Sequence, residues 1–175
     1  MKIKIKTTTP RRGIVLAFAI AAGLAGVALG AQALNPKLVA KADGPSGLKW
    51  IGGDSESALM RPGMSCIGCH AKGEGPRFQI AGTVYTNLDE KDEYFGVEGL
   101  TVQVTDAKGK VAKYDTNKAG NFYSGRFSSL KAPFAVKVLG KKGENAMNSP
   151  APSGDCASCH TAEGAEGAPG RVIAP

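Results

Sequence analysis

The sequence predicts a mainly β protein: a small antiparallel β-sandwich flanked by two short helical or loop segments. Between residues 78 and 139, short runs that alternate apolar and polar residues are separated by turn residues, and no stretch there keeps a helical period. The 24 Gly and 10 Pro residues fit a chain with many turns. A length of 175 residues, of which 42% are hydrophobic, suits one ordinary domain or two very small ones.

We divide the chain into four parts. Residues 1–33 form a signal peptide, and residues 34–77 form an extended lead-in that ends in a first cysteine motif. Residues 78–147 form the β-sandwich, and residues 148–175 contain a second cysteine motif and a short tail. The two motifs are thus separated in the sequence by residues 71–155, and the sequence leaves open whether the sandwich holds them together or apart.

The first 33 residues have the pattern of an export signal. A basic start is followed by an apolar run over residues 14–29, and the small residues Ala31 and Ala33 mark a cleavage site. Cleavage places the mature N-terminus near Leu34 and the protein in the periplasm or at the cell surface. The alternative is an uncleaved anchor, and only in that case do we expect the chain to bind a membrane.

The net charge of +7 at pH 7 comes mainly from this signal segment. Five of the 22 basic residues and none of the 15 acidic residues precede Leu34. The rest of the chain has 22 − 5 basic residues against 15 acidic ones, a net charge of +2. Because no basic patch dominates the remainder, we expect no nucleic-acid partner.

The strands expected in the sandwich share alternating β-branched or aromatic residues and are bounded by Gly, Asn, Asp or Lys. The turn at residues 106–110 predicts that the strands on either side of it pair as an antiparallel hairpin. A second turn and the strand that follows it are expected within residues 116–123. The other expected strands are residues 79–86, 100–105, 111–114 and 134–139.

Two pentapeptides contain every Cys and every His of the chain: CIGCH at residues 66–70 and CASCH at residues 156–160. The pattern Cys-x-x-Cys-His is typical of covalent haem attachment. Two thiols three positions apart on one helical turn can add to the two vinyl groups of one haem, and the next residue is placed to bind its iron. We therefore predict two haem c cofactors, attached at Cys66, Cys69, Cys156 and Cys159, with His70 and His160 as the proximal iron ligands.

Other uses of four cysteines explain the pattern less well. Zinc ribbons have much shorter spacing than the separation between Cys69 and Cys156, and two disulfides would leave the position of each His unexplained. A thioredoxin-like redox pair needs a βαβ context, which the sequence does not show.

The chain resembles small exported bacterial dihaem c-type cytochromes in which a β-sandwich lies between two haem-binding segments. The resemblance is carried by residues 78–85 after the first motif, and by residues 154–156 and 168–171 around the second. The series Gly-Leu-Thr-Val-x-Val-x-Asp and Gly-Asn-Phe also resembles carboxypeptidase-regulatory or transthyretin-like sandwich domains. The resemblance implies a scaffold that has no chemistry of its own.

The resemblance also implies residues around each haem. In c-type cytochromes a proline carbonyl after the motif accepts the N–H of the proximal His, so we expect this contact from Pro76 and Pro169, although both also fit plain turns. Arg77 and Arg171 follow at similar positions, and they are candidates to pair with haem propionates. Solvated arginines are the alternative.

Both His are used on the proximal side, so the opposite iron ligand must be Met, Lys, a terminal amine, water or nothing. After the signal only Met60, Met64 and Met147 remain, and Met binding raises a haem potential. Met147 is the first candidate, because it follows the last expected strand and lies nine residues before Cys156. Met60 and Met64 are the other candidates.

The motifs, without a recognisable catalytic acid, base or nucleophile, indicate electron transfer with redox partner proteins rather than an enzyme. A dihaem peroxidase or a haem-based ligand sensor is the alternative, although the sequence has no spare His for the distal side of a haem. A further alternative is a subunit of a surface haem-protein assembly, in which copies of the chain associate.

Overall fold

The computed structural model describes residues 39–41, 48–50, 52, 56–73, 75–91 and 94–175. Residues 33–175 form one unit. The predicted signal peptide, residues 1–33, lies outside the described residues. None of the helices in the described part is long and apolar enough to cross a membrane.

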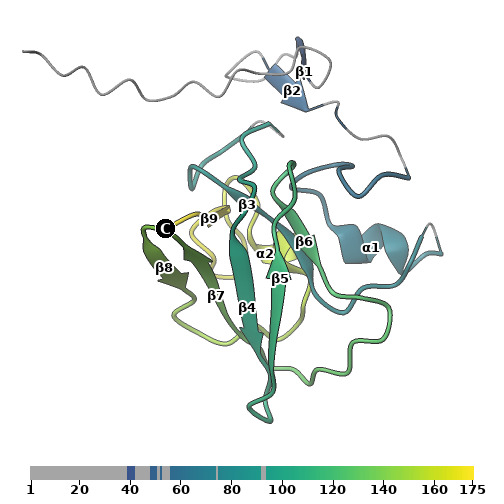
Figure 1. The fold of residues 1–175 in the computed structure, drawn as a ribbon, viewed down its shortest axis with the longest axis vertical. Helices are drawn as coiled ribbons and strands as arrows, with labels where there is room; N and C mark the ends of the chain where they lie inside the picture. The colour runs from purple at the N-terminus through teal and green to yellow at the C-terminus, as the bar shows by residue number, and fades with distance from the viewer. Residues whose placement is uncertain (1–38, 42–47, 51, 53–55, 74, 92–93) are drawn as a thin grey trace, which may run out of the picture. The chain divides into compact units, whose positions relative to one another are not determined.

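Strands predominate in the described residues, and helix is confined to two single turns (Figure 1). The prediction of a mainly β fold with two short helical segments is therefore confirmed. In chain order the elements are β1 (Val39–Lys41), β2 (Leu48–Trp50), α1 (Cys66–His70), β3 (Ala81–Tyr85), β4 (Thr101–Thr105), β5 (Val111–Asp115), β6 (Asn121–Tyr123), β7 (Ala135–Gly140), β8 (Gly143–Ala146), α2 (Cys156–Cys159) and β9 (Val172–Ile173).

The larger sheet has the strand order β5-β4-β7-β8, and all its neighbouring strands are antiparallel. The smaller sheet has the order β6-β3-β9, in which β3 is antiparallel to β6 and parallel to β9. Strands β1 and β2 form a separate antiparallel pair. Short turns connect β4 to β5 and β7 to β8, which fits their antiparallel pairing.

The two sheets share one hydrophobic core. In β4 the residues Val102 and Val104 are fully buried, whereas the residues between them are half-buried, as expected for a strand with one face on a core. Strands β3, β6 and β7 add residues to the same cluster. Its buried members are Ile80, Val84, Val102, Val104, Phe122, Leu130, Phe134 and Val138.

The β3 strand differs from the others because all five of its residues are buried. It is the central strand of the smaller sheet, with β6 on one side and β9 on the other. Both short helices pack against it. The strand therefore connects the core to the two cysteine motifs.

Each strand expected from the sequence is present within one or two residues, but β1 and β2 in the lead-in, and β8 and β9, were not expected. The β8 sequence, Gly-Glu-Asn-Ala, has no apolar alternation, and β9 has only two residues. The region after residue 148 therefore does more than hold a motif and a tail: its strand β9 completes the smaller sheet. Such short strands depend on distant partners, so local pattern gives little signal for them.

One buried acidic side chain organises the β4–β5 turn. Oδ1 of Asp106 accepts hydrogen bonds from the backbone N–H groups of Lys108 and Lys110, both at 2.8 Å, and Oδ2 accepts from that of Lys131 at 3.0 Å. Burial alone would raise the pKa of Asp106, but the three N–H donors outweigh it and the pKa is lowered. The ionised carboxylate is thus the form that holds the turn.

We expect Asp106→Asn to lower the melting temperature at neutral pH, because an amide presents N–H groups where the carboxylate accepts three. A lowered folded-state pKa contributes stability above the unfolded-state value of about 4, and that stability is lost as the pH falls through the folded-state pKa. The difference between wild type and variant should therefore shrink on acidification, as followed by thermal denaturation. Asp115→Asn is the matched control, since the Asp115 side chain is exposed and, within the described residues, accepts one hydrogen bond, from the Thr101 hydroxyl. An equal decrease in melting temperature in Asp106→Asn and Asp115→Asn would contradict the prediction.

Candidate functional site

The first motif forms α1, a single turn that begins after Ser65. The Ser65 hydroxyl accepts a hydrogen bond from the backbone N–H of Gly68 at 3.0 Å and so caps the helix. Residues three apart share one face of a helix, so Cys66 and Cys69 lie on the same side. None of the residues of α1 is fully buried, and both of its cysteines are half-buried.

The second motif forms α2 in a similar way. Asp155 precedes the helix, and the backbone N–H of His160 donates to the carbonyl of Cys156 at 2.9 Å. Cys156 and Cys159 again share one helical turn. The two motifs therefore have the same local structure, a pair of thiols on one turn followed by an imidazole.

A backbone carbonyl orients the first imidazole. Nδ1 of His70 donates to the carbonyl of Pro76 at 2.7 Å, which is the contact expected from the sequence. In that tautomer Nε2 carries the lone pair and is the nitrogen available to a metal. The His70 ring also lies against Gly75, where a Cβ atom would stand only 2.7 Å from Cε1. A side chain at residue 75 would displace the ring.

The second imidazole has the same type of contact with a different residue. Nδ1 of His160 donates to the carbonyl of Gly170 at 2.8 Å, so the prediction that Pro169 supplies this carbonyl is wrong by one position. The acceptor follows the His by six residues at the first site and by ten at the second. The longer connection turns through Gly167 and Gly170, which both have positive φ, and spacing alone does not reveal which carbonyl faces the ring.

The two motifs begin side by side. The Ser65 hydroxyl, which caps α1, donates to Oδ2 of Asp155, the residue before α2, at 2.5 Å. These residues are 90 positions apart in the chain. The other carboxylate oxygen, Oδ1, is buried and has no hydrogen-bond partner in the described part of the chain. We call this contact the Ser65–Asp155 junction.

Strand β3 holds both sides of the junction. The backbone N–H of Gly63, just before α1, donates to the Thr83 hydroxyl at 2.9 Å. The backbone N–H of Ala81 donates to the carbonyl of Gly154, just before α2, also at 2.9 Å. Both motifs are therefore fixed to the same buried strand.

The environment of the thiols favours their protonated form. The pKa of Cys156 is raised to about 12, mainly by burial and further by the nearby Asp155 carboxylate and Cys66. Burial and Asp155 also raise the pKa of Cys66. All four cysteines are free. Within the described residues, no three His, Cys, Asp or Glu side chains gather as a chelating group.

The two arginines that the sequence suggests as partners of haem propionates have different surroundings. Arg171 donates from Nε to the carbonyl of Glu90 at 3.0 Å and from Nη1 to that of Gly63 at 3.2 Å, and its guanidinium lies 5.0 Å from the centroid of the Tyr85 ring. It thus ties the C-terminal segment to the approach to α1. Arg77 is exposed. Pairing of either side chain with a propionate stays a prediction.

The three methionines that are candidates for the distal iron ligand lie in different parts of the structure. Met64, 49% exposed, and Met60 both lie on the segment that leads into α1. Met147 directly follows β8, the edge strand of the larger sheet, and Figure 1 shows β8 and α1 on opposite sides of the molecule. The structure therefore does not bring Met147 toward the first motif. The distal ligands stay predictions.

The sequence interpretation missed three features of the site. Ser65 has the ordinary signature of a helix cap, a Ser directly before a helical motif, and that signal could have identified it. The role of Asp155 depends on a distant contact. Phe78 stacks on His70 with ring centroids 4.6 Å apart and on Tyr123 at 4.8 Å, which no local pattern indicates.

Comparison of the chain with protein-family models, with curated proteins and with solved structures finds no match in any of the three. The resemblance to dihaem cytochromes and to transthyretin-like sandwiches therefore stays a prediction. What can be argued about function comes from the motifs and their geometry.

Proposed function

We propose that the protein is an exported dihaem c-type cytochrome that acts in electron transfer. One observation carries the proposal: two Cys-x-x-Cys-His turns start at a single hydrogen-bonded junction, and each is followed by an imidazole whose Nδ1 is bound to a carbonyl. The signal pattern of residues 1–33 supports export, with a mature chain that begins near Leu34.

Each motif supplies a complete set of donors for one haem. Cys66, Cys69 and His70 would hold the first, and the corresponding residues of α2 would hold the second. When bound, haem supplies an iron that gains and loses one electron. The carbonyls of Pro76 and Gly170 keep Nε2 directed away from the backbone and raise the basicity of each imidazole.

The Ser65–Asp155 junction supports electron exchange within one chain. It joins the residues directly before Cys66 and Cys156, the first cysteine of each motif. Because both segments are also bonded to β3, their separation is fixed by buried backbone. A rigid pair of cofactors is suited to pass electrons between redox partner proteins.

A redox titration of the purified protein, followed by visible spectra, tests this function. We expect two redox-active haems per chain, both in one-electron steps and with little peroxide turnover above that of free haem, because no residue is evident for proton transfer to peroxide. A chain without a redox-active chromophore would refute the proposal. Substrate-dependent peroxide turnover that disappears when one residue is changed would establish the enzyme alternative instead.

A further inference from the structure

We propose that the loop of residues 125–130, together with Lys110, is the surface on which an acidic electron-transfer protein docks, beside the first haem site. This inference rests on the proposed function, because it states where the redox partner binds. We call residues 125–130 the Phe127 loop. Four properties support the proposal: its exposed aromatic residue, its hollow, its charge and its attachment to the first motif.

Phe127 is 92% exposed, far more than any other large apolar side chain of the described residues, of which the next is 50% exposed. A single exposed apolar residue is ordinary on a protein surface and proves nothing alone. Aromatic residues, Phe included, are however enriched in protein interfaces relative to the rest of the surface.

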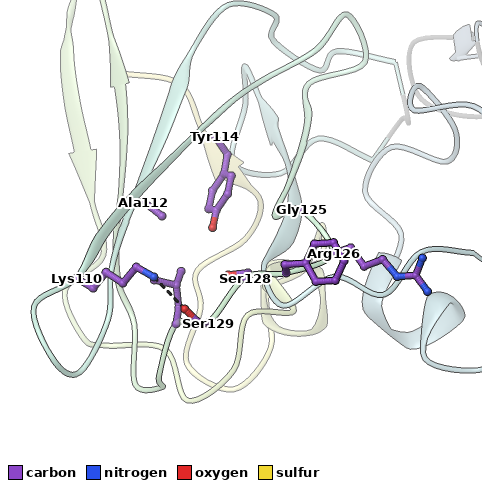
Figure 2. Close-up of a pocket in the computed structure, with 9 residues that line it drawn as sticks. Lys110, Ala112, Tyr114, Gly125, Arg126, Ser128 and Ser129 are labelled. Carbon is purple, nitrogen blue, oxygen red and sulfur yellow. Dashed lines mark hydrogen bonds between the residues drawn. The ribbon is translucent and has the colours of Figure 1, made fainter.

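The loop forms one wall of a hollow of about 380 Å³, and β5 forms the other. Figure 2 shows Tyr114 and Ala112 on the β5 side, with Arg126 extending from the loop on the side away from Lys110. Nζ of Lys110 donates to Oγ of Ser129 at 2.9 Å and so ties the β4–β5 turn to the loop. The hollow is lined by two cationic side chains, Lys110 and Arg126, and by no acidic one.

The positive charge is concentrated in this part of the sequence. Residues 105–131 contain six basic residues against two acidic ones, a net charge of +4, whereas the rest of the chain after residue 33 then has a net charge of 2 − 4 = −2. Neither acidic residue of this range lines the hollow: Asp106 accepts from three backbone N–H groups of the β4–β5 turn and its neighbourhood, and Asp115 accepts from the Thr101 hydroxyl. The hollow thus places the exposed Phe127 beside two cationic side chains, Lys110 and Arg126, and this combination complements an acidic protein surface.

The Phe127 loop is fixed to the first motif at both ends. The backbone N–H of Gln79 donates to the Ser124 hydroxyl at 2.8 Å, just before the loop. At its other end, Leu130 donates its backbone N–H to Oε1 of Gln79 at 2.9 Å and accepts from Nε2 of the same side chain. Gln79 follows Phe78, whose ring stacks on His70. A partner on this loop would therefore lie on a preformed surface that is directly attached to the first imidazole.

The test is reduction of the holoprotein by flavodoxin hydroquinone, a small acidic redox protein used as the probe, in a stopped-flow experiment. We expect the double variant Lys110→Glu/Arg126→Glu to lower the second-order rate about tenfold at low salt, with the difference lost at high salt. Phe127→Ala should lower the rate at both salt concentrations. The matched control is Lys141→Glu/Lys142→Glu, which changes the net charge equally at the exposed β7–β8 turn, on the opposite edge of the larger sheet. It should stay within about twofold of wild type.

Equal slowing by the two double variants would show that net charge alone matters and would overturn the docking surface. Unchanged rates in all variants would overturn it as well. If the wild type self-associates in sedimentation experiments and Phe127→Ala abolishes this, the loop binds a second copy and the proposal is wrong. Reduction by dithionite separates these outcomes from failure of the proposed function, since a chain without haem shows no spectral change with dithionite either.

Discussion

The double variant Cys156→Ala/Cys159→Ala is expected to carry one covalent haem where the wild type carries two. Thioether bonds to both cysteines of α2 are the only covalent attachment that the second motif offers, and the structure leaves all four thiols free for this reaction. The measurement is the intact mass of the denatured protein, together with haem staining after denaturing electrophoresis. The first haem should remain, because α1 has its own thiols and its own imidazole contact with Pro76.

The reciprocal variant, Cys66→Ala/Cys69→Ala, should retain only the second haem. Ser158→Ala is the matched control, since Ser158 is exposed between the two cysteines of α2 and the change removes its hydroxyl contacts with the Asp155 carbonyl and the Cys159 sulfur but neither thiol. It should keep both haems. Two haems in either cysteine variant, or complete extraction of haem from the wild type by acid acetone, would contradict the assignment of both motifs.

The sequence was sufficient to predict features that depend on neighbouring residues. The alternation in β4 and the turn before β5 specify an antiparallel hairpin, because side chains of a strand alternate between core and solvent. The spacing of Cys66, Cys69 and His70 places the thiols on one helical turn for the same kind of reason. These predictions needed only periodicity and short-range geometry.

Contacts between segments that are distant in the sequence could not be predicted from periodicity and short-range geometry. The Ser65–Asp155 junction joins residues 90 positions apart, and it decides that the two motifs lie together rather than at opposite ends of the sandwich. The parallel pairing of β9 with β3 brings the C-terminal segment to the same place. The carbonyl of Gly170 replaces that of Pro169 because the path of this segment is set by its turns and by its pairing, not by its spacing from the motif.

Gly82→Val is expected to destabilise the protein strongly and to interfere with the second haem site. Gly82 lies in β3, where a Cβ atom would stand 2.8 Å from Cβ of Cys156 and 2.9 Å from Cζ of Phe122. Neither neighbour can easily move. Phe122 is a fully buried core residue paired with Gly82 across the sheet, and Cys156 is fixed by the bond from Ala81 to the residues before α2. Overpacking of this kind costs about 1–3 kcal/mol, and more where the backbone must shift.

The strain should therefore appear in two measurements, a lower melting temperature and a smaller fraction of chains that hold the second haem by intact mass. The control is Gly125→Val, because a Cβ at Gly125 meets no atom within 4 Å, so the same substitution adds volume in open space. Gly125→Val should keep the melting temperature and both haems. If Gly82→Val behaved like the control, α2 would not pack on β3 as closely as the structure shows, and the two motifs would not share one platform. A loss of stability in Gly82→Val with full retention of both haems would instead place the strain on Phe122 and the core, and leave the attachment of the second haem independent of β3.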